Sequence, residues 1–232
     1  MGCWSEKLSV GETETADWHF KLNTADGSHF GLYQNAVLKG EVNWTLTGKH
    51  NAYNGMMAII AARHVGIDVE HAIAALGQFS GVKRRMELVG EIGNISVFDD
   101  FAHHPTAIAT TLEGLRNSVG DEKIIAVIEP RSNTMRLGCH REKLANSVAL
   151  ANVVVWYKPE DLNWPLDDIL RASATATKNL VKSQISSVVD TVIDSVKSSI
   201  TGTEKAHIVI MSNGGFGGVH KKILARLAAL AG

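Results

Sequence analysis

Two carboxylates and two imidazoles lie close together in the stretch Asp99–Pro105, which reads D-D-F-A-H-H-P. It follows an apolar run typical of a β-strand and leads into a helical pattern. A helix N-terminus beside a strand end is a place to hold a phosphate or a nucleotide sugar, because its first N–H groups are free. Asp100 can accept hydrogen bonds from ribose hydroxyls, and His103 can face a phosphate or the reacting group. The alternative is structural, with His104 capping a helix that begins at Pro105.

A second polar group, G-K-H-N-A-Y-N, begins at Gly48. Asn51 and Asn54 stand three residues apart on one face of a predicted helix, and His50 stands at its start. An amide presents a donor and an acceptor together, which suits the edge of an adenine ring. The alternative is that His50 or Asn51 caps the helix while Asn54 is solvated.

A basic segment, K-R-R-M-E from Lys83 to Glu87, follows a stretch at 77–82 whose Gly and Ser residues predict a hinge. The planar guanidinium fork of arginine matches a phosphate, and a hinge would let it swing onto a bound nucleotide. The alternative for this segment is a solvated basic turn.

Two further loops follow apolar runs, one after Ile128 and one after Met211. The carboxyl ends of parallel strands share one edge of a sheet, so we expect both loops to line one crevice beside the Asp100 corner. Arginines in the first loop can hold carboxylates. Glycines in the second leave N–H groups free for an anion, although a tight turn would also need them. The candidate substrate-binding residues are Arg131, Ser132, Asn133, Arg136, Asn213, Gly214 and Gly215.

Two kinds of structure are expected to position these residues. Alternating apolar and polar residues up to about residue 47 predict antiparallel strands and hairpins, followed by helices at 51–65 and 69–76. From residue 82 onward strands and helices alternate, which predicts a parallel sheet with helices on both faces. The predicted strands are 86–89, 95–98, 124–128, 153–156 and 207–211, and the predicted helices are 106–118, 142–149, 185–200 and the C-terminal segment, with helical sequence also after Pro165 and over 172–187.

The expected fold class is therefore α/β. Residues 82–232 would form a Rossmann-like parallel-sheet domain, preceded by a first domain of residues 1–81.

Composition excludes several classes of function. The 232 residues carry a formal net charge of −1, so no basic excess points to nucleic acid. The two cysteines, Cys3 and Cys139, lie far apart, which fits a reducing compartment and argues against a disulfide scaffold or structural zinc. The apolar runs are too short to span a bilayer, and no secretion signal is recognisable. We expect a soluble cytoplasmic protein with no nucleic-acid or membrane partner, and we predict no metal ligands among its residues.

The motifs G-x-H-N-x-x-N, R-x-E after a hinge, and D-D-F-x-H-H-P, in this order, resemble those of the Mur ligase family. These ATP-dependent enzymes form amide bonds in bacterial cell-wall synthesis. The resemblance covers nearly the whole chain and implies ATP and Mg²⁺ as cofactors. It implies that His50, Asn51 and Asn54 face the adenine, Arg85 the phosphates and Asp100 the ribose, with His103 nearby and, like Arg85, in a catalytic role.

The detailed sequence of these motifs indicates a substrate class, including the segments E-P-R-S-N-T-M-R-L-G and S-N-G-G-F-G-G. It most resembles members that join L-alanyl-γ-D-glutamyl-meso-diaminopimelate, hereafter the tripeptide, to UDP-N-acetylmuramate in peptidoglycan recycling. Members that handle diaminopimelate carry a Pro-Arg pair in a comparable loop, which here is Pro130–Arg131 and implies that Arg131 clamps a carboxylate. Members that add L-alanine usually have Tyr where this chain has Phe101.

The chain departs from the family pattern because the phosphate loop G-T-x-G-K-[ST] is absent. The resemblance then implies that residues 1–81 are the end of the central ATP-binding domain and residues 82–232 the C-terminal, peptide-binding domain. Most Mg²⁺ ligands would lie outside the chain, and we expect the chain alone to have no ligase turnover. Two alternatives stay open: a portion of an L-alanine-adding ligase, or a non-catalytic module that binds muropeptide or nucleotide.

Overall fold

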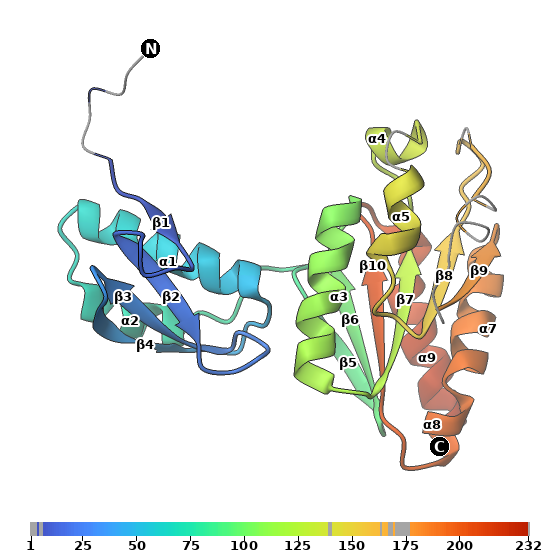
Figure 1. The fold of residues 1–232 in the computed structure, drawn as a ribbon. Coiled ribbons are helices and arrows are strands. Elements are labelled where there is room, and N and C mark those ends of the chain that lie inside the picture. Colours follow the sequence, from blue (N-terminus) through green and yellow to red (C-terminus); the bar gives the residue numbers. More distant parts are fainter. Residues whose placement is uncertain are drawn as a thin grey trace. The chain divides into compact units, whose positions relative to one another are not determined.

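The computed structural model describes residues 4, 7–138, 141–162, 164–166, 169 and 177–231. The chain folds as two compact units, Met1–Gly81 and Val82–Gly232 (Figure 1). Each unit has hydrophobic cores of its own. The functional roles predicted for the two units remain predictions.

The first unit packs a four-stranded sheet against two helices. Trp18 and Phe20 alternate along one strand and therefore point to the same side, where they meet Met56 and Ile59 of the first helix. Gly55 lets this helix approach closely, because a Cβ there would lie 2.8 Å from the Trp44 ring. The strands lie in the order β1 (Val10–Gly11), β2 (Trp18–Leu22), β3 (His29–Gln34) and β4 (Val37–Asn43), and the helices are α1 (Lys49–His64) and α2 (Val69–Gly77). The predicted antiparallel pairing is confirmed for β2, β3 and β4, while β1 runs parallel to β2.

The second unit is built on a six-stranded sheet in the order β5-β6-β10-β7-β8-β9. All neighbours are parallel except β5, which pairs antiparallel with β6. Every residue of β10 is buried, as expected for a central strand covered on both faces. The strands are β5 (Glu87–Ile92), β6 (Ile95–Asp100), β7 (Lys123–Ile128), β8 (Val153–Tyr157), β9 (Lys178–Lys182) and β10 (Ala206–Met211).

Helices cover both faces of this sheet (Figure 1). Helices α3 and α5 pack into the core on one face, and α7 and α9 into the core on the other. The predicted α/β fold class with a parallel-sheet domain is thereby confirmed. The helices are α3 (Pro105–Val119), α4 (Asn133–Arg136), α5 (Arg141–Ser147), α7 (Ile185–Ser195), α8 (Lys197–Thr201) and α9 (Val219–Ala231), with a 3₁₀ turn at Phe216–Gly218.

The structure corrects two local predictions. Helical sequence was expected over 172–187, but Lys178–Lys182 forms β9 at the edge of the sheet, because pairing with β8 outweighs the weak helical preference of this segment. A single helix was expected over 185–200, but α7 ends at Ser195 and α8 begins after Val196, whose φ of −111° and ψ of 11° are not helical. The helical sequence predicted directly after Pro165 lies largely outside the described residues, as do Cys3 and Cys139. No helix in the described part of the chain has the length and apolar character needed to cross a membrane.

Candidate active site

Three strand ends meet at one edge of the second unit's sheet. Met211, the last residue of β10, is in register with Asp100 at the end of β6 and with Ile128 at the end of β7. The segments that follow these strands therefore begin side by side. This confirms the expectation that both loops open on the same edge as the Asp100 corner, which is where ligands bind in open α/β sheets.

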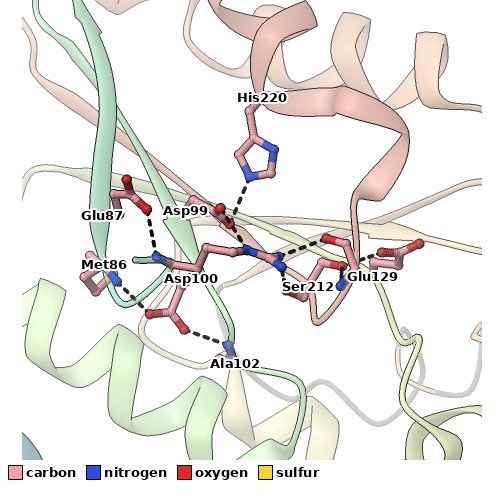
Figure 2. Close-up of polar contacts among 10 residues, drawn as sticks. Met86, Glu87, Asp99, Asp100, Ala102, Glu129, Ser212 and His220 are labelled. Atoms are coloured by element: carbon pink, nitrogen blue, oxygen red, sulfur yellow. Dashed lines mark hydrogen bonds and ion pairs between the residues drawn. The ribbon is translucent and has the colours of Figure 1, made fainter. Parts of the chain in front are cut away.

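Figure 2 shows Asp99 near the end of β6 and Ser212 directly after β10, and Arg84 connects the two. Its Nε donates to Asp99 Oδ2 at 3.0 Å, and its Nη2 donates to the carbonyl oxygens of Ser212 at 2.5 Å and Gly214 at 2.9 Å. From α9, His220 Nε2 lies 3.0 Å from the other Asp99 oxygen. The Asp99 carboxylate is almost fully buried and is held between two cationic or polar groups.

Asp100 faces the protein interior. One of its oxygens accepts from the Met86 N–H at 2.9 Å, and the other from the Ala102 N–H at 2.7 Å and the Thr111 hydroxyl at 3.3 Å. Burial raises the pKa of this carboxyl, while those hydrogen bonds and the charge of Arg85 oppose the rise. The predicted ribose contact remains a prediction. A ribose hydroxyl bound there would have to share Asp100 oxygens that already accept hydrogen bonds from the protein.

Glu129 and Ser212 join the loop after β7 to the loop after β10. The Ser212 hydroxyl donates to Glu129 Oε2 and accepts from the Gly214 N–H at 3.0 Å. Both side chains are buried. The two loops are therefore held by a shared hydrogen-bond chain and do not fold independently.

Two of the predicted peptide-binding residues are in direct contact. A Cβ added at Gly214 would overlap the guanidinium group of Arg131 and lie 2.8 Å from its Cδ. Arg131 is exposed, and its guanidinium lies directly against the glycine at a surface that a ligand can reach. Arg136 instead pairs with Asp161.

The remaining candidates in the two loops have mixed surroundings. The Ser132 hydroxyl accepts from the Met135 N–H at 3.4 Å as the cap of α4 and lies 3.3 Å from the His103 carbonyl oxygen. Asn213 Oδ1 is buried and has no hydrogen-bond partner among the residues that the structure describes. Asn133 and Gly215 are exposed.

The aromatic ring of Phe101 organises the cations beside it. The guanidinium carbons of Arg84 and Arg85 lie 5.3 and 5.6 Å from its centroid, within reach of a cation–π interaction. The His103 ring meets Phe101 edge-on, and its Nδ1 lies 2.8 Å from the Phe101 carbonyl oxygen. His104 accepts from the Thr106 N–H at 3.3 Å, which confirms the capping alternative for this histidine.

The three adenine candidates belong to the first unit and lie in the first turns of α1. His50 and Asn54 are exposed, and Asn51 donates through its amide to the Thr47 carbonyl at 2.8 Å. The helix cap is Gly48 with φ 98°, so neither His50 nor Asn51 occupies the cap position. Their role at the adenine remains a prediction.

Five residues of the network were not selected as binding residues by sequence reasoning: Arg84, Asp99, Glu129, Ser212 and His220. The signal that was available for Asp99, Glu129 and Ser212 is their position at or directly after the end of an apolar strand. No comparable local signal marks His220.

A protein-family model described as "Mur ligase, glutamate ligase domain" matches residues 84–214, which is more than half of the chain. The chain belongs to the Mur ligase family. The resemblance inferred from the sequence motifs is thereby confirmed.

Two curated relatives of this Mur ligase chain match over nearly all of its length. Both are named UDP-N-acetylmuramate–L-alanyl-gamma-D-glutamyl-meso-2,6-diaminoheptandioate ligase. The one from Escherichia coli K12 is 45% identical over 232 residues, which are 100% of this chain and 49% of the relative. The one from Haemophilus influenzae is 41% identical over 228 residues, which are 98% of this chain and 48% of the relative. The chain thus spans about half the length of these relatives.

Solved structures agree with this assignment. The crystal structure of a murein peptide ligase from Psychrobacter arcticus aligns with a TM-score of 0.65 and 43% identity, covering 94% of this chain and 45% of the other. The UDP-N-acetylmuramate–alanine ligase of Thermotoga maritima aligns with a TM-score of 0.72 and 21% identity, over 96% of this chain and 48% of the other. At that identity the second match supports the fold alone.

Proposed function

We propose that this chain is part of an ATP-dependent ligase that joins the tripeptide to UDP-N-acetylmuramate, and that its second unit binds the tripeptide. The observation that supports this most is the carboxyl edge of the sheet, where Arg131 rests on Gly214 between the loops that follow β7 and β10. The names of the two relatives that match along nearly the whole chain support the same substrates.

The proposed reaction passes through an acyl phosphate. ATP transfers its terminal phosphoryl group to the muramate carboxylate, the tripeptide amine attacks the acyl carbon, and inorganic phosphate leaves. Arg131 would clamp a peptide carboxylate through its planar fork, and the exposed Arg85 would face the phosphates. The first turns of α1 would contact the adenine, through His50, Asn51 and Asn54.

The described residues fit a nucleotide better than they fit a metal ion. Arg85 is an exposed cation beside the Asp100 corner, as a phosphate contact requires. Among the described residues, no group of three or more His, Cys, Asp or Glu side chains is arranged to hold a metal ion. The proposal is that the Mg²⁺ expected for the family draws its ligands largely from parts of the enzyme outside these residues.

Calorimetry with the tripeptide tests the binding role of the second unit. We expect saturable binding of the tripeptide, a loss of about tenfold in affinity for Arg131→Met, and no binding of L-alanine alone. We also expect no phosphate release when the chain is mixed with ATP, UDP-N-acetylmuramate and tripeptide. Binding of L-alanine in preference to the tripeptide would favour the alanine-adding alternative, and robust phosphate release would contradict the expected inactivity.

A non-catalytic binding module is the second candidate, supported by the exposed Arg85 and Arg131, whose guanidinium groups can bind a phosphate or a carboxylate without catalysis. Fusion to the part of the Escherichia coli relative that the chain does not match separates the two. A ligase portion should then release phosphate in a tripeptide-dependent manner, whereas a module should bind the tripeptide without turnover.

A further inference from the structure

Two neighbouring arginines at the start of the second unit have different surroundings. Arg85 is exposed, whereas Arg84 is partly buried and its side chain makes three hydrogen bonds, to Asp99, Ser212 and Gly214. Arg84 also has a φ of 60°, in the left-handed region that non-glycine residues rarely adopt. Such a backbone persists only where the surrounding contacts hold it, and here Glu87 accepts from the Arg84 N–H at 2.8 Å.

The contacts of Arg84 hold the start of the glycine-rich loop. The carbonyl oxygens of Ser212 and Gly214 follow the last residue of β10, so they have left the sheet's regular ladder. One guanidinium nitrogen donates to both carbonyls while Nε donates to Asp99 at the end of β6. Because the guanidinium is planar, these contacts fix the two loop carbonyls relative to β6.

The position of Gly214 in turn limits where Arg131 can lie. There is no room for a Cβ between Gly214 and the Arg131 side chain, so the two groups are in van der Waals contact. The Gly214 N–H is bonded to Ser212, and its carbonyl is bonded to Arg84. The surface against which the Arg131 guanidinium lies is therefore fixed from both sides of the glycine.

We infer that Arg84 is a positioning residue of the peptide site, which acts through Gly214 to hold the guanidinium of Arg131 in its binding orientation. The inference rests on the proposed function, because there Arg131 binds a carboxylate of the tripeptide. The two arginines then have different roles. Arg85 faces the nucleotide phosphates, and Arg84 orders the loop that follows β10.

The first test measures the order of Arg131 in the ligand-free chain. Nitrogen-15 relaxation of the Arg131 Nε–H is compared in the wild type, Arg84→Met, Arg84→Lys and Lys83→Met, at a temperature well below the unfolding transition of each. We expect the Arg131 order parameter to fall below about 0.6 in Arg84→Met and to stay unchanged in Lys83→Met, which removes a neighbouring exposed charge. Arg84→Lys should give only partial rescue, because an ammonium lacks the fork. A purely structural Arg84 would lower the melting temperature and leave Arg131 ordered.

The second test uses tripeptide binding and a matched ligand. In the matched tripeptide, lysine replaces diaminopimelate and so lacks the distal carboxylate. Arg84→Met should weaken binding of the natural tripeptide about tenfold and of the lysine tripeptide less than twofold. In the Arg84→Met/Arg131→Met double variant, the loss should equal that of Arg131→Met alone, because both changes remove the same contact.

The outcomes separate the two proposals. Full affinity for the natural tripeptide together with an ordered Arg131 in Arg84→Met overturns the inference and leaves the proposed function intact. Absence of tripeptide binding by the wild type overturns the proposed binding role of this chain, and the relaxation measurement alone then decides whether Arg84 orders Arg131.

Discussion

Buried polar residues lie at both ends of β10, but their contacts have different structural effects at the two ends. At the carboxyl end, Arg84 holds the backbone carbonyls of a loop, and Ser212 joins that loop to Glu129. At the amino end, His207 Nε2 lies 2.6 Å from Glu122 Oε2, a contact between a side chain of β10 and the residue directly before β7. The first arrangement fixes the conformation of a segment that leaves the sheet, and the second only fastens strands that already pair.

The difference shows where a parallel-sheet unit needs side chains to order its backbone. Loops at the carboxyl edge have no ladder partners, so a specific conformation there requires side chains that bond to backbone. At the amino edge the connections are short, and the ladder itself determines their course. Changes at the carboxyl end should therefore affect loop order and binding together, whereas changes at the amino end should affect stability alone.

The largest effect is expected at Asp99. Asp99→Ala removes the carboxylate that pairs with Arg84 and His220 and leaves a partly buried guanidinium unpaired. We expect a loss of about 2–3 kcal/mol in the free energy of unfolding, somewhat below the cost for a fully buried pair because the Arg84 side chain is 31% exposed. Urea unfolding measures it. Asp99→Asn keeps the shape and removes the charge, so its loss measures the contribution of the charge. Wild-type stability in Asp99→Asn would contradict a role for the charge.

The next effect is expected at Gly214, for which the neighbouring glycine is a matched control. A Cβ at Gly214 overlaps Arg131, whereas no atom of the described residues lies within 4 Å of a Cβ at Gly215, and neither position has a positive φ. We expect Gly214→Ala to cost about 1–2 kcal/mol of stability and to weaken tripeptide binding, because it displaces the arginine. Gly215→Ala should stay within about 0.5 kcal/mol of the wild type. Similar effects from both substitutions would mean that the contact with Arg131 is unimportant.

Much of this edge could be predicted from sequence, because the signals were local. Apolar runs followed by D-D or by S-N-G-G predicted where β6 and β10 end, and their parallel alternation predicted that the ends share an edge. The identity of the bonded partners could not be predicted. Arg84 meets Ser212 across 128 residues, and that contact depends on β10 inserting between β6 and β7, which no local pattern encodes.

Local sequence patterns also failed to predict the strand at the edge of the sheet and the break between two helices. The segment Lys178–Lys182 has only two apolar residues, so its sequence does not distinguish a strand from a helix, and pairing with β8 decides. The break at Val196 interrupts a run whose apolar spacing stays helical on both sides. In both places tertiary contacts override a weak local preference.

The two ends of the sheet should also respond oppositely to pH. Burial raises the pKa of Asp100 at the carboxyl end, so the folded chain binds a proton more readily there than the unfolded chain. Its contribution to stability is present below the unfolded pKa of about 4 and is lost as pH rises through the folded pKa. The hydrogen bond from His207 lowers the pKa of Glu122 at the amino end. Its contribution is present above the unfolded pKa of about 4.3 and is lost as pH falls through the folded pKa.

Urea unfolding between pH 3 and pH 7 separates these contributions. Asp100→Asn should remove the decline in stability with rising pH, relative to the wild type. Glu122→Gln should lower stability at neutral pH by about 0.5 kcal/mol, at the low end for a side-chain hydrogen bond, and the difference should vanish at pH 3. Parallel pH profiles for the wild type and both variants would show that neither carboxyl has a shifted pKa.

The smallest effect is expected at Arg136, which sharpens the assignment of Arg131. Arg136 pairs with Asp161, and their side chains are 37% and 54% exposed, so Arg136→Ala should cost no more than about 0.5 kcal/mol of stability. Because that guanidinium already has a carboxylate partner in the chain, we expect Arg136→Ala to weaken tripeptide binding less than twofold, against about tenfold for Arg131→Ala. Asp161→Ala is the variant to compare with it, because it removes the carboxylate partner of Arg136 and leaves the arginine in place. If Arg136→Ala and Arg131→Ala weakened binding equally, both arginines would have to contact the peptide, and the pair with Asp161 would have to open when the ligand binds.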